Sequence, residues 1–317
     1  MGSRCELVRG HFSTNMFSRT VVSMMSRNRK FLMILGSIWL LDGLMQFKPL
    51  MFTQNFVTSV IWPNTWYQPM DIAYPIYLAG KIILGNVAVF DIMFGLIQLA
   101  IGILFITGKY IRAAIIFSVI WAVAVWWIGE GFGGLFTGRA SLLTGAPGAA
   151  ILYALAGIIL YPMKNMERSE INSVKIAKYS LGFIFILGFL LQMQPYYFMS
   201  RNVTWDLAVN WFVGISASQS AIFDIFIASL FLYTGSGLVL FRSGKGGKNI
   251  FLYISIALSI FIWVPGELFG GIYTPLGTDP NTGILLVLLT AMAMYPRKIP
   301  AHHAQEEKEN SVYKNMA

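Results

Sequence analysis

Long runs of apolar residues, separated by short polar stretches, dominate this chain. Eight such runs lie at residues 31–47, 88–107, 111–128, 146–161, 178–193, 219–241, 249–265 and 282–295. Each approaches the roughly 20 residues that an α-helix needs to cross the hydrocarbon of a bilayer. The runs are apolar on all sides, whereas the strands of a transmembrane barrel alternate between apolar and polar residues. The pattern therefore predicts an all-α integral membrane protein with eight transmembrane helices.

Composition and charge agree with this prediction. Of the 317 residues, 56% are hydrophobic and only 12% are charged, which argues against a soluble fold. All but four of the 23 Lys and Arg residues fall in segments that lie on one side of the membrane if the N-terminus is inside; the exceptions are Lys48, Lys81, Arg139 and Arg201. By the positive-inside rule we expect a multi-pass protein of the plasma membrane with both termini cytoplasmic. The net charge of +9 then reflects membrane insertion and contact with the lipid bilayer, and we expect no nucleic-acid partner.

The second half of the chain repeats landmarks of the first half in the same order. The turn GEGFGGLFT after the third apolar run matches GELFGGIYT after the seventh at six of nine positions. The other recurring landmarks are Gln46 and Pro49 with Gln192 and Pro195, Phe90-Asp91 with Phe223-Asp224, and Tyr161-Pro162 with Tyr295-Pro296. Four spans are an even number, so both repeats enter the membrane in the same direction. The sequence predicts an internal duplication of two parallel four-helix repeats.

These patterns divide the chain into five segments. We expect a cytoplasmic basic N-terminal segment, a first four-helix repeat, a cytoplasmic linker, a second four-helix repeat and a cytoplasmic tail, at residues 1–30, 31–162, 163–174, 175–296 and 297–317. Residues 53–87, between the first two spans, are rich in aromatic residues and proline. Such segments typically lie at the membrane interface, so we expect a partial lid at the outer end.

Residues that ligate haem, copper or iron-sulfur clusters are scarce in this sequence. The chain has one cysteine, Cys5, and its three histidines, His11, His302 and His303, lie outside the predicted spans. The 16 methionines are scattered through apolar runs, where methionine commonly fills gaps in packing. We therefore expect no covalently bound cofactor and no metal site.

Two glutamates, Glu130 and Glu267, occupy the same place in the repeated turn. They end spans that run outward, where the helix dipole opposes an anion, so a cation, a proton, a donor from another helix or the following backbone N–H groups must compensate them. Trp126 and Trp263 precede the turns, and burial among aromatic residues is expected to raise the pKa of both glutamates. Two interpretations stay open: a proton or ligand site, and a carboxyl that only holds a glycine turn in place.

Three aspartates complete the set of candidate residues. Asp91 and Asp224 occur near the start of spans that run inward, where a carboxylate caps free N–H groups. Because the second and third spans of each half are antiparallel neighbours, we expect Asp91 and Asp224 each to share a cavity with the glutamate of the same half. Asp42 lies inside the first span, where an acid is costly and indicates a functional role, and Lys48 compensates it only if the chain turns back. The candidate ligand-binding residues are Glu130, Glu267, Asp91, Asp224, Trp126, Trp263 and Asp42, and no catalytic residue is identified.

Several motifs resemble those of known membrane families. The first span ends with Gly43-Leu-Met-Gln46-Phe-Lys-Pro49, and four-helix units with such an end resemble the DoxX and DoxD group, of which DoxD is a subunit of an archaeal thiosulfate:quinone oxidoreductase. The motifs LLDG at 40–43, WWIGEGFGGLFTG at 126–138 and TGAPGAA at 144–150 are similar to those of a largely uncharacterised set of polytopic prokaryotic proteins. The DoxD resemblance implies a quinone as cofactor and a role in a respiratory chain.

Three functional classes remain open. The first is a subunit of a quinone-dependent oxidoreductase that has no redox centre of its own and has other membrane-complex subunits as partners. The second is a small-solute transporter or membrane binding protein, although few intramembrane charges and no obvious broken helix argue against ion coupling. The third is a structural subunit of a respiratory complex. The sequence favours the first and third.

Overall fold

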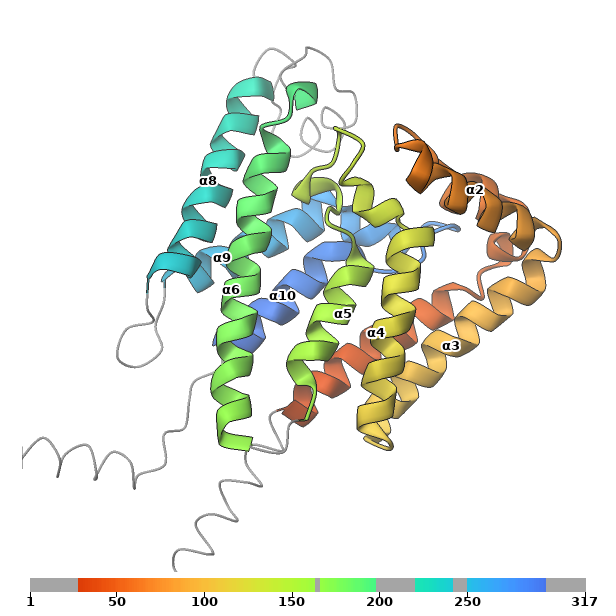
Figure 1. Cartoon of the computed structure of the whole chain (residues 1–317), viewed down its shortest axis with the longest axis horizontal. Coiled ribbons are helices and arrows are strands. Elements are labelled where there is room, and N and C mark those ends of the chain that lie inside the picture. Colours follow the sequence, from red (N-terminus) through yellow and green to blue (C-terminus); the bar gives the residue numbers. More distant parts are fainter. Residues whose placement is uncertain (1–27, 163–165, 198–219, 242–249, 295–317) are drawn as a thin grey trace, which may run out of the picture.

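The computed structural model describes residues 28–162, 166–197, 220–241 and 250–294 of the chain (Figure 1). Within these residues the secondary structure is helical, and no strand occurs. The expected N-terminal segment before residue 28 and the tail after residue 294 lie outside the described residues. So do Cys5, His11, Arg201, His302 and His303.

Helices occupy the positions of all eight apolar runs. The first half contains a helix over residues 28–45, then α3 (Val87–Thr107), α4 (Ile111–Ile128) and α5 (Ala149–Leu160), and the second half contains α6 (Met166–Gln192), α8 (Ser220–Leu240), α9 (Ile250–Phe261) and α10 (Asn281–Met294). A further helix, α2 (Met70–Leu84), lies between the first helix and α3. The remaining elements are 3-10 turns at Pro49–Phe52, Trp62–Thr65, Gly131–Gly134, Leu142–Thr144, Pro195–Tyr197 and Leu268–Gly271, and π-helices at Phe56–Ile61 and Ile262–Gly266.

Four of these helices are long and apolar enough to cross a membrane. They are Val87–Thr107, Ile111–Ile128, and the segments Ser173–Gln192 of α6 and Ile222–Leu240 of α8. In contrast, α5 has only 12 residues and α10 only 14. At about 1.5 Å per residue, α5 is roughly 18 Å long, against roughly 30 Å of hydrocarbon. The apolar runs thus predict the places of the helices, but α5 and α10 are too short to cross the hydrocarbon as full spans.

Buried loops account for the short helices. The sequence predicts a span from residue 146, whereas α5 begins at Ala149 after a loop that contains the buried residues Leu142, Leu143 and Ala146. Leu142 packs on Gly188 of α6, where an added Cβ would lie 2.7 Å from the Leu142 side chain. The apolar residues before α5 therefore pack in the interior as a loop and not as a further helical turn.

The linker expected at residues 163–174 is instead largely helical, because α6 begins at Met166 and continues without a break to Gln192. Ser173 donates a hydrogen bond of 3.0 Å to the carbonyl of Ile159, near the end of α5. The two halves are therefore joined by a short connection and the first turns of α6.

The two halves share a glycine-mediated helix crossing. In the first half, a Cβ on Gly102 of α3 would lie 2.8 Å from the Gly36 carbonyl of helix 28–45, and in the second a Cβ on Gly235 of α8 would lie 2.7 Å from the Gly182 carbonyl of α6. Small residues at such crossings let helix backbones approach closely, as is common in membrane proteins. Helix 28–45 crosses α3 in the first half in the same way as α6 crosses α8 in the second.

A basic side chain also bonds the two helices of each pair together, at the C-terminal end of α3 and of α8. Arg29 donates to the carbonyls of Phe105 and Ile106 at the C-terminal end of α3. Lys178 of α6 donates to the carbonyl of Phe241, just beyond α8. Both interactions satisfy carbonyls that a helix end leaves free, and the helix dipole favours a cation there.

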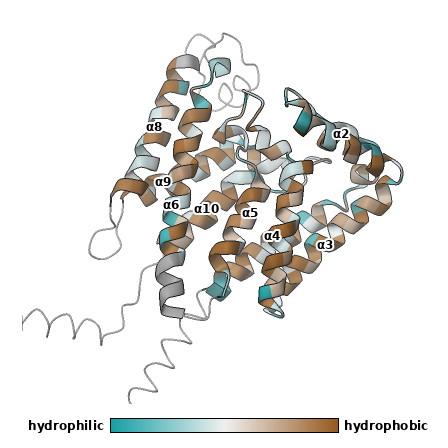
Figure 2. Cartoon of the chain, in the orientation of Figure 1, coloured by the Kyte–Doolittle hydropathy of each residue, from teal (hydrophilic) through white to brown (hydrophobic). Residues whose placement is uncertain are grey.

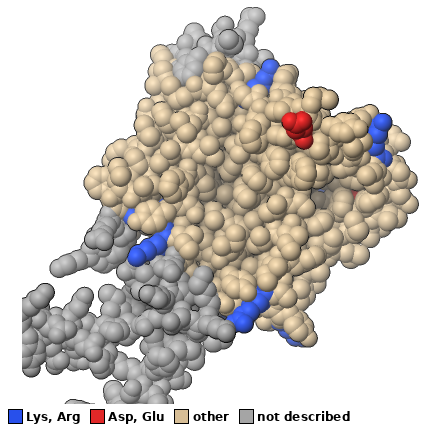
Figure 3. Space-filling view, in the orientation of Figure 1, with Lys and Arg blue, Asp and Glu red and all other residues tan. Residues whose placement is uncertain are grey.

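Apolar side chains cover the outside of the bundle. Figure 2 shows brown, hydrophobic residues along the outer faces of the helices, and in Figure 3 only a few charged residues interrupt the face in view. Exposed residues include Ile120 (62%) on α4 and Phe183 (62%) on α6. This surface suits contact with lipid chains, so the described part of the chain is that of a membrane protein with transmembrane helices.

Residues 49–84 cover one end of the bundle, and we call them the lid. We call this end, where helix 28–45, α4, α6 and α9 finish, the turn end. The helix α2 lies across the ends of α3 and α4 (Figure 1), and Met51, Val57 and Ile76 form a separate small core beneath it. Trp62 stacks on Tyr77 with ring centroids 5.5 Å apart. The lid expected from the aromatic and proline-rich sequence is therefore a packed helical unit.

Candidate functional site

The repeated turns adopt the same backbone conformation. After α4, Phe132 has φ 57° and ψ 32°, and after the π-helix that extends α9, Phe269 has φ 58° and ψ 26°. The indole N–H of Trp126 donates to the carbonyl of Pro147 at 2.6 Å, and that of Trp263 donates to the carbonyl of Pro280 at 2.8 Å. Each tryptophan thus fixes the loop that leads into the next short helix.

A glycine within each turn allows the close approach of that loop. Gly133 has φ +62°, and a Cβ on it would overlap the carbonyl group of Pro147. Gly270 has φ +70°, and a Cβ there would lie 2.6 Å from the carbonyl oxygen of Asp279. Only glycine combines this left-handed conformation with the close contact. The glycine clusters thus form turns that follow a helix.

Glu130 and Glu267 bind the start of the following helix. The Glu130 carboxylate accepts the backbone N–H of Ala150 at 3.0 Å, at the start of α5. Glu267 accepts the N–H of Gly283 at 2.9 Å, at the start of α10. Of the compensating partners expected from sequence, the structure therefore has a donor from another helix, whose N-terminal dipole favours the acid.

Both glutamates have raised pKa values. Burial, reinforced by the negative charge of Asp279, raises the pKa of Glu130 to about 8. Burial raises the pKa of Glu267 well above its usual range, and the hydrogen bond from Gly283 opposes this only in part. A carboxyl with such a pKa is neutral over part of the physiological pH range and can exchange a proton.

Asp42 pairs with a tyrosine of the same half. The Tyr153 hydroxyl of α5 donates a hydrogen bond to Asp42 Oδ2, and the Tyr153 ring packs on Trp39 with ring centroids 4.3 Å apart. The other carboxylate oxygen, Oδ1, is buried without a hydrogen-bond partner among the described residues. Gly188 stands at the corresponding position of the second half, so this acid belongs to the first half alone.

Lys48 does not compensate Asp42. Its Nζ instead donates to three carbonyls of the second half, those of Ile272, Thr274 and Gly277, at 2.9, 2.8 and 3.0 Å. From the sequence, Lys48 compensates Asp42 only if the chain turns back, and the structure instead directs the lysine toward the loop before α10. Lys48 thereby joins the two halves at the turn end.

Asp91 and Asp224 do not cap their helices. Asn86 caps α3 by accepting the N–H of Val89, and Asp91 lies one turn inside the helix with no exposed surface. Neither carboxylate oxygen of Asp91 has a hydrogen-bond partner among the described residues. Asp224 is likewise inside α8 and accepts from the Gln192 side chain at 2.8 Å. Their burial follows from their position on the face of each helix that packs against the first helix of its half.

A cavity of about 250 Å³ lies inside the first half at the turn end. Its polar wall contains Asp42, Gln46, Gln98, Glu130, Tyr153 and Asp279. Its aromatic wall contains Trp39, Phe56, Phe94 and Trp121. We call this space the inner cavity. The lid contributes Phe56, Val60, Ile61 and Ile83, so the lid closes one side of the cavity.

A wider, more polar space of about 590 Å³ adjoins the inner cavity, and we call it the vestibule. The two share a rim formed by Val60, Gly129, Glu130, Ala149, Thr278 and Asp279. The vestibule also reaches Arg139, whose guanidinium lies 3.3 Å from the centre of the Tyr67 ring. Two acids therefore stand where the vestibule meets the inner cavity.

Comparison of the chain with protein-family models, with curated proteins and with solved structures finds no match. The geometry of the site is therefore the basis for its function.

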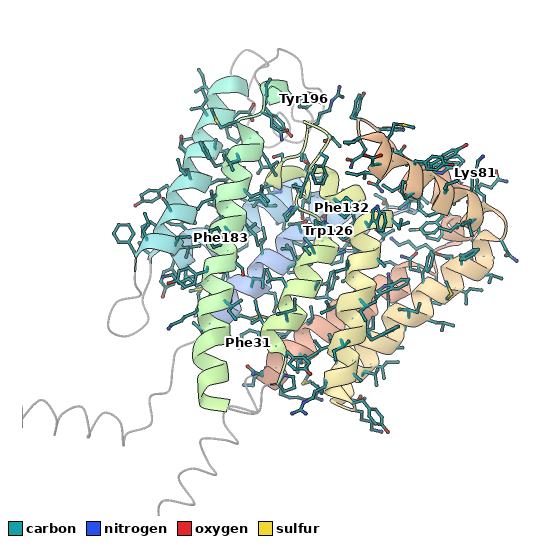
Figure 4. The ribbon with its side chains drawn as sticks, in the orientation of Figure 1. Phe31, Lys81, Trp126, Phe132, Phe183 and Tyr196 are labelled. Atoms are coloured by element: carbon teal, nitrogen blue, oxygen red, sulfur yellow. The ribbon has the colours of Figure 1, made fainter. Side chains whose placement is uncertain are left out.

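The structure brings together only part of the candidate set. Asp42 and Glu130 line the inner cavity, whereas Asp91, Asp224, Glu267, Trp126 and Trp263 line neither space. Asp91 therefore does not line the cavity that Glu130 lines. Figure 4 shows Trp126 next to Phe132 near the end of α4, and the two rings meet edge to face at 4.9 Å. The two tryptophans thus stabilise the turns without lining either space.

Asp279 and Tyr153 are the residues that sequence reasoning missed. Asp279 lies just before α10 and accepts the N–H of Asn281 at 2.7 Å. It also reaches across from the second half to line the inner cavity. Burial raises its pKa, while hydrogen bonds from Thr278 and Asn281 oppose the shift. In the sequence, the one indication of this wall of the cavity is Gln98, a polar residue within an apolar run.

The described residues contain no group of three His, Cys, Asp or Glu side chains that lie close enough together to hold a metal ion. The three acids of the inner cavity are therefore not grouped as the ligands of one metal ion. Such an arrangement offers separate contacts to a molecule that occupies the space between them.

Proposed function

We propose that the chain is a multi-pass protein of two parallel four-helix repeats, with eight membrane-inserted helices and both termini cytoplasmic. The glycine crossings, the cations at helix ends and the Trp–Glu turns recur at equivalent places in the two halves and support this proposal. Arg29, Lys30, Lys109, Arg112, Lys175 and Lys178 all lie at the end opposite the turn end. The positive-inside rule then assigns the turn end to the outside.

We infer that the protein binds a small solute that enters from the turn end, as a membrane binding protein or as the binding part of a transporter. The observation that carries this inference is the vestibule that leads, over a rim with two acids, into the inner cavity. Mostly apolar cavities with a few convergent polar groups are the usual form of small-molecule sites.

The short helices support the same function. Non-helical backbone within a membrane protein is tolerated where it is buried or lines a cavity, and the loop before α5 does both. Secondary transporters place interrupted helices at their solute sites. The sequence shows no obvious broken helix, but in the structure α5 and α10 begin at buried residues such as Ala149 and Thr282, which supports a solute site despite the expectation against ion coupling.

A quinone-linked role in a respiratory membrane complex is the second candidate. The observation in its favour is that Trp39 and Trp121 line the inner cavity and that their indole N–H groups have no hydrogen-bond partner among the described residues. A quinone carries only acceptor oxygens, so two free donors in an aromatic cavity suit its head group. This role requires partner subunits that carry the redox centres.

Thiol labelling from one side of the membrane tests the solute route. In a Cys5→Ser background, Thr278→Cys places a single thiol on the rim shared by the vestibule and the inner cavity. A membrane-impermeant methanethiosulfonate added outside intact cells should label this thiol within minutes. Added only to the cytoplasmic face of inverted vesicles, it should not.

Ile120→Cys is the matched control, because Ile120 is exposed on the outer face of α4 and lines neither space. It should stay unlabelled from both sides, since a charged reagent does not enter lipid. Labelling of Thr278→Cys only from the cytoplasmic face, or from neither face, would contradict a route from the outside.

A further inference from the structure

We propose that the inner cavity binds a small organic cation, an ammonium group attached to an apolar body. This assignment rests on the proposed solute-binding function and names the class of solute. It begins with the charges of the cavity wall. Among the described residues, Asp42, Glu130 and Asp279 line the inner cavity, and no Lys, Arg or His does.

The cavity also presents hydrogen-bond acceptors that lack a donor. Asp42 Oδ1, Gln46 Oε1 and Gln98 Oε1 are all buried without a partner among the described residues. The three side chains are only 2%, 5% and 7% exposed, and all three line the cavity. A buried acceptor without a donor costs roughly 1–3 kcal/mol. An ammonium group has three donors and no acceptor, so it matches this set.

Aromatic rings provide the second kind of contact. Phe94 lies 5.6 Å from Trp121 and 6.3 Å from Phe56, measured between ring centroids, and all three rings line the cavity. Aromatic faces attract cations, and the attraction is stronger where the cation is removed from water. The rings also pack against the hydrocarbon part of an amine.

Size and spacing favour an organic cation over a metal ion. The volume of about 250 Å³ is several times the roughly 30 Å³ that one water molecule occupies. The described acids do not gather into a metal-binding group. A body of several carbon atoms fills the space that a bare ion leaves empty.

Two cations of the protein lie near this site and do not occupy it. Arg139 lines only the vestibule, where its guanidinium lies 3.3 and 4.9 Å from the ring centres of Tyr67 and Tyr196. Lys48 lines neither space, and three carbonyls hold its ammonium group. Within the part of the chain that the structure describes, the acidic wall of the inner cavity therefore has no basic side chain along its lining.

Calorimetric titration of the purified full-length protein in detergent tests the assignment. The probes are butylammonium chloride, butan-1-ol and sodium butyrate, which share a four-carbon body and differ in the charge of the head group. Butylammonium should bind saturably, and the alcohol and the carboxylate should bind at least tenfold more weakly.

Variants locate the binding. Asp42→Asn and Glu130→Gln keep the size of each side chain and should each weaken butylammonium binding at least tenfold. Glu267→Gln is the matched control, because Glu267 occupies the equivalent turn but does not line the cavity. The affinity of this variant for butylammonium should stay within twofold of wild type. Melting temperatures of all three variants show that the fold is retained.

Three results would overturn the cation assignment: no butylammonium binding, equal binding of butan-1-ol, or unchanged affinity in both Asp42→Asn and Glu130→Gln. If such a result accompanies outside labelling of Thr278→Cys, the solute route stands and only the class of solute is wrong. If the thiol is not labelled from outside, the proposed solute route itself fails.

Discussion

At the scale of single residues, Glu130 and Glu267 have the same local bonds and different surroundings. Each accepts a backbone N–H at the start of the next short helix. Of the two, Glu130 lines the inner cavity beside Asp42 and Tyr153, and the second half has Gly188 and Leu286 at the corresponding positions. The same turn therefore holds the next helix in both halves and lines the inner cavity in the first half.

The stability of the protein should depend on pH through Glu130. Burial raises its pKa from 4.5 to about 8, so the folded state holds this proton more tightly than the unfolded state. The resulting stabilisation is fully present below about pH 4.5 and is lost as the pH rises through about 8. The melting temperature in detergent should therefore fall between about pH 5 and about pH 9.

The variant Glu130→Gln isolates this effect. The charged or titratable groups that share the rim and walls are Asp42, Asp279, Tyr153 and, in the vestibule, Arg139. Asp279 and Glu267 also have raised pKa values, so the variant should reduce the fall in melting temperature without abolishing it. A melting temperature that rises over this range, or a slope equal to wild type in the variant, would show that Glu130 does not titrate in this way.

Removal of the Tyr153 hydroxyl should destabilise the first half. In Tyr153→Phe, Asp42 Oδ2 loses its donor, and Oδ1 already lacks one among the described residues. We expect a loss of about 1–3 kcal/mol in unfolding free energy, measured by denaturant titration in detergent. Tyr253→Phe, at a side chain of α9 that is 50% exposed, is the control and should change stability by less than about 0.5 kcal/mol. Equal stability of the two variants would mean that Asp42 does not depend on Tyr153.

The sequence identifies the unusual residues of the site and not their partners. Asp42 stands out because an acid within an apolar span is costly. Tyr153 follows it by 111 positions, and only the packing of α5 against the first helix brings them together. Asp279 likewise lines the cavity only because the second half packs against the first. Local pattern carries no information on which helices pack against each other.

At the scale of helices, glycine sets the distance between the first two helices of each half. In Gly102→Ala, the new Cβ would lie 2.7 Å from Leu40 and 2.8 Å from the Gly36 carbonyl. The helices must then separate, which should cost about 1–3 kcal/mol of unfolding free energy. Gly157→Ala in α5 is the matched control, because its Cβ would meet Val119 at an ordinary 3.4 Å.

The control should be neutral or slightly stabilising, since alanine favours a helix more than glycine does. Both variants are compared by unfolding in detergent. A Gly102→Ala variant as stable as Gly157→Ala would show that the two helices cross elsewhere.

The positions of the helices follow from hydropathy, but the start of α5 does not. The run 146–161 is almost entirely apolar, yet α5 begins only at Ala149, after Pro147 and Gly148. Gly145 and Gly148 adopt φ values of 101° and 108°, which interrupt the helix before that point. Hydropathy registers the apolar side chains of a buried loop and a buried helix alike, so it cannot separate the two.

At the scale of the whole molecule, Lys48 joins the two halves across the site. Its three hydrogen bonds hold the loop over residues 272–277, directly before Asp279. In Lys48→Met this loop should loosen, and its backbone amides should exchange with deuterium at least tenfold faster. Lys81→Met on the exposed face of α2 is the control and should leave the loop unchanged. Unchanged exchange in Lys48→Met would mean that the halves are held together without this contact.

Access of a charged reagent to the inner cavity tests the central claim most directly. Ala124 lines the inner cavity from α4, and Ile120 lies one turn below it, outside the cavity. In a Cys5→Ser background, a positively charged trimethylammonium methanethiosulfonate added outside should label Ala124→Cys and not Ile120→Cys, and butylammonium chloride should slow the labelling at least fivefold. Equal labelling of both thiols, or labelling of Ala124→Cys at the same rate with and without butylammonium, would contradict a cation site entered from the outside.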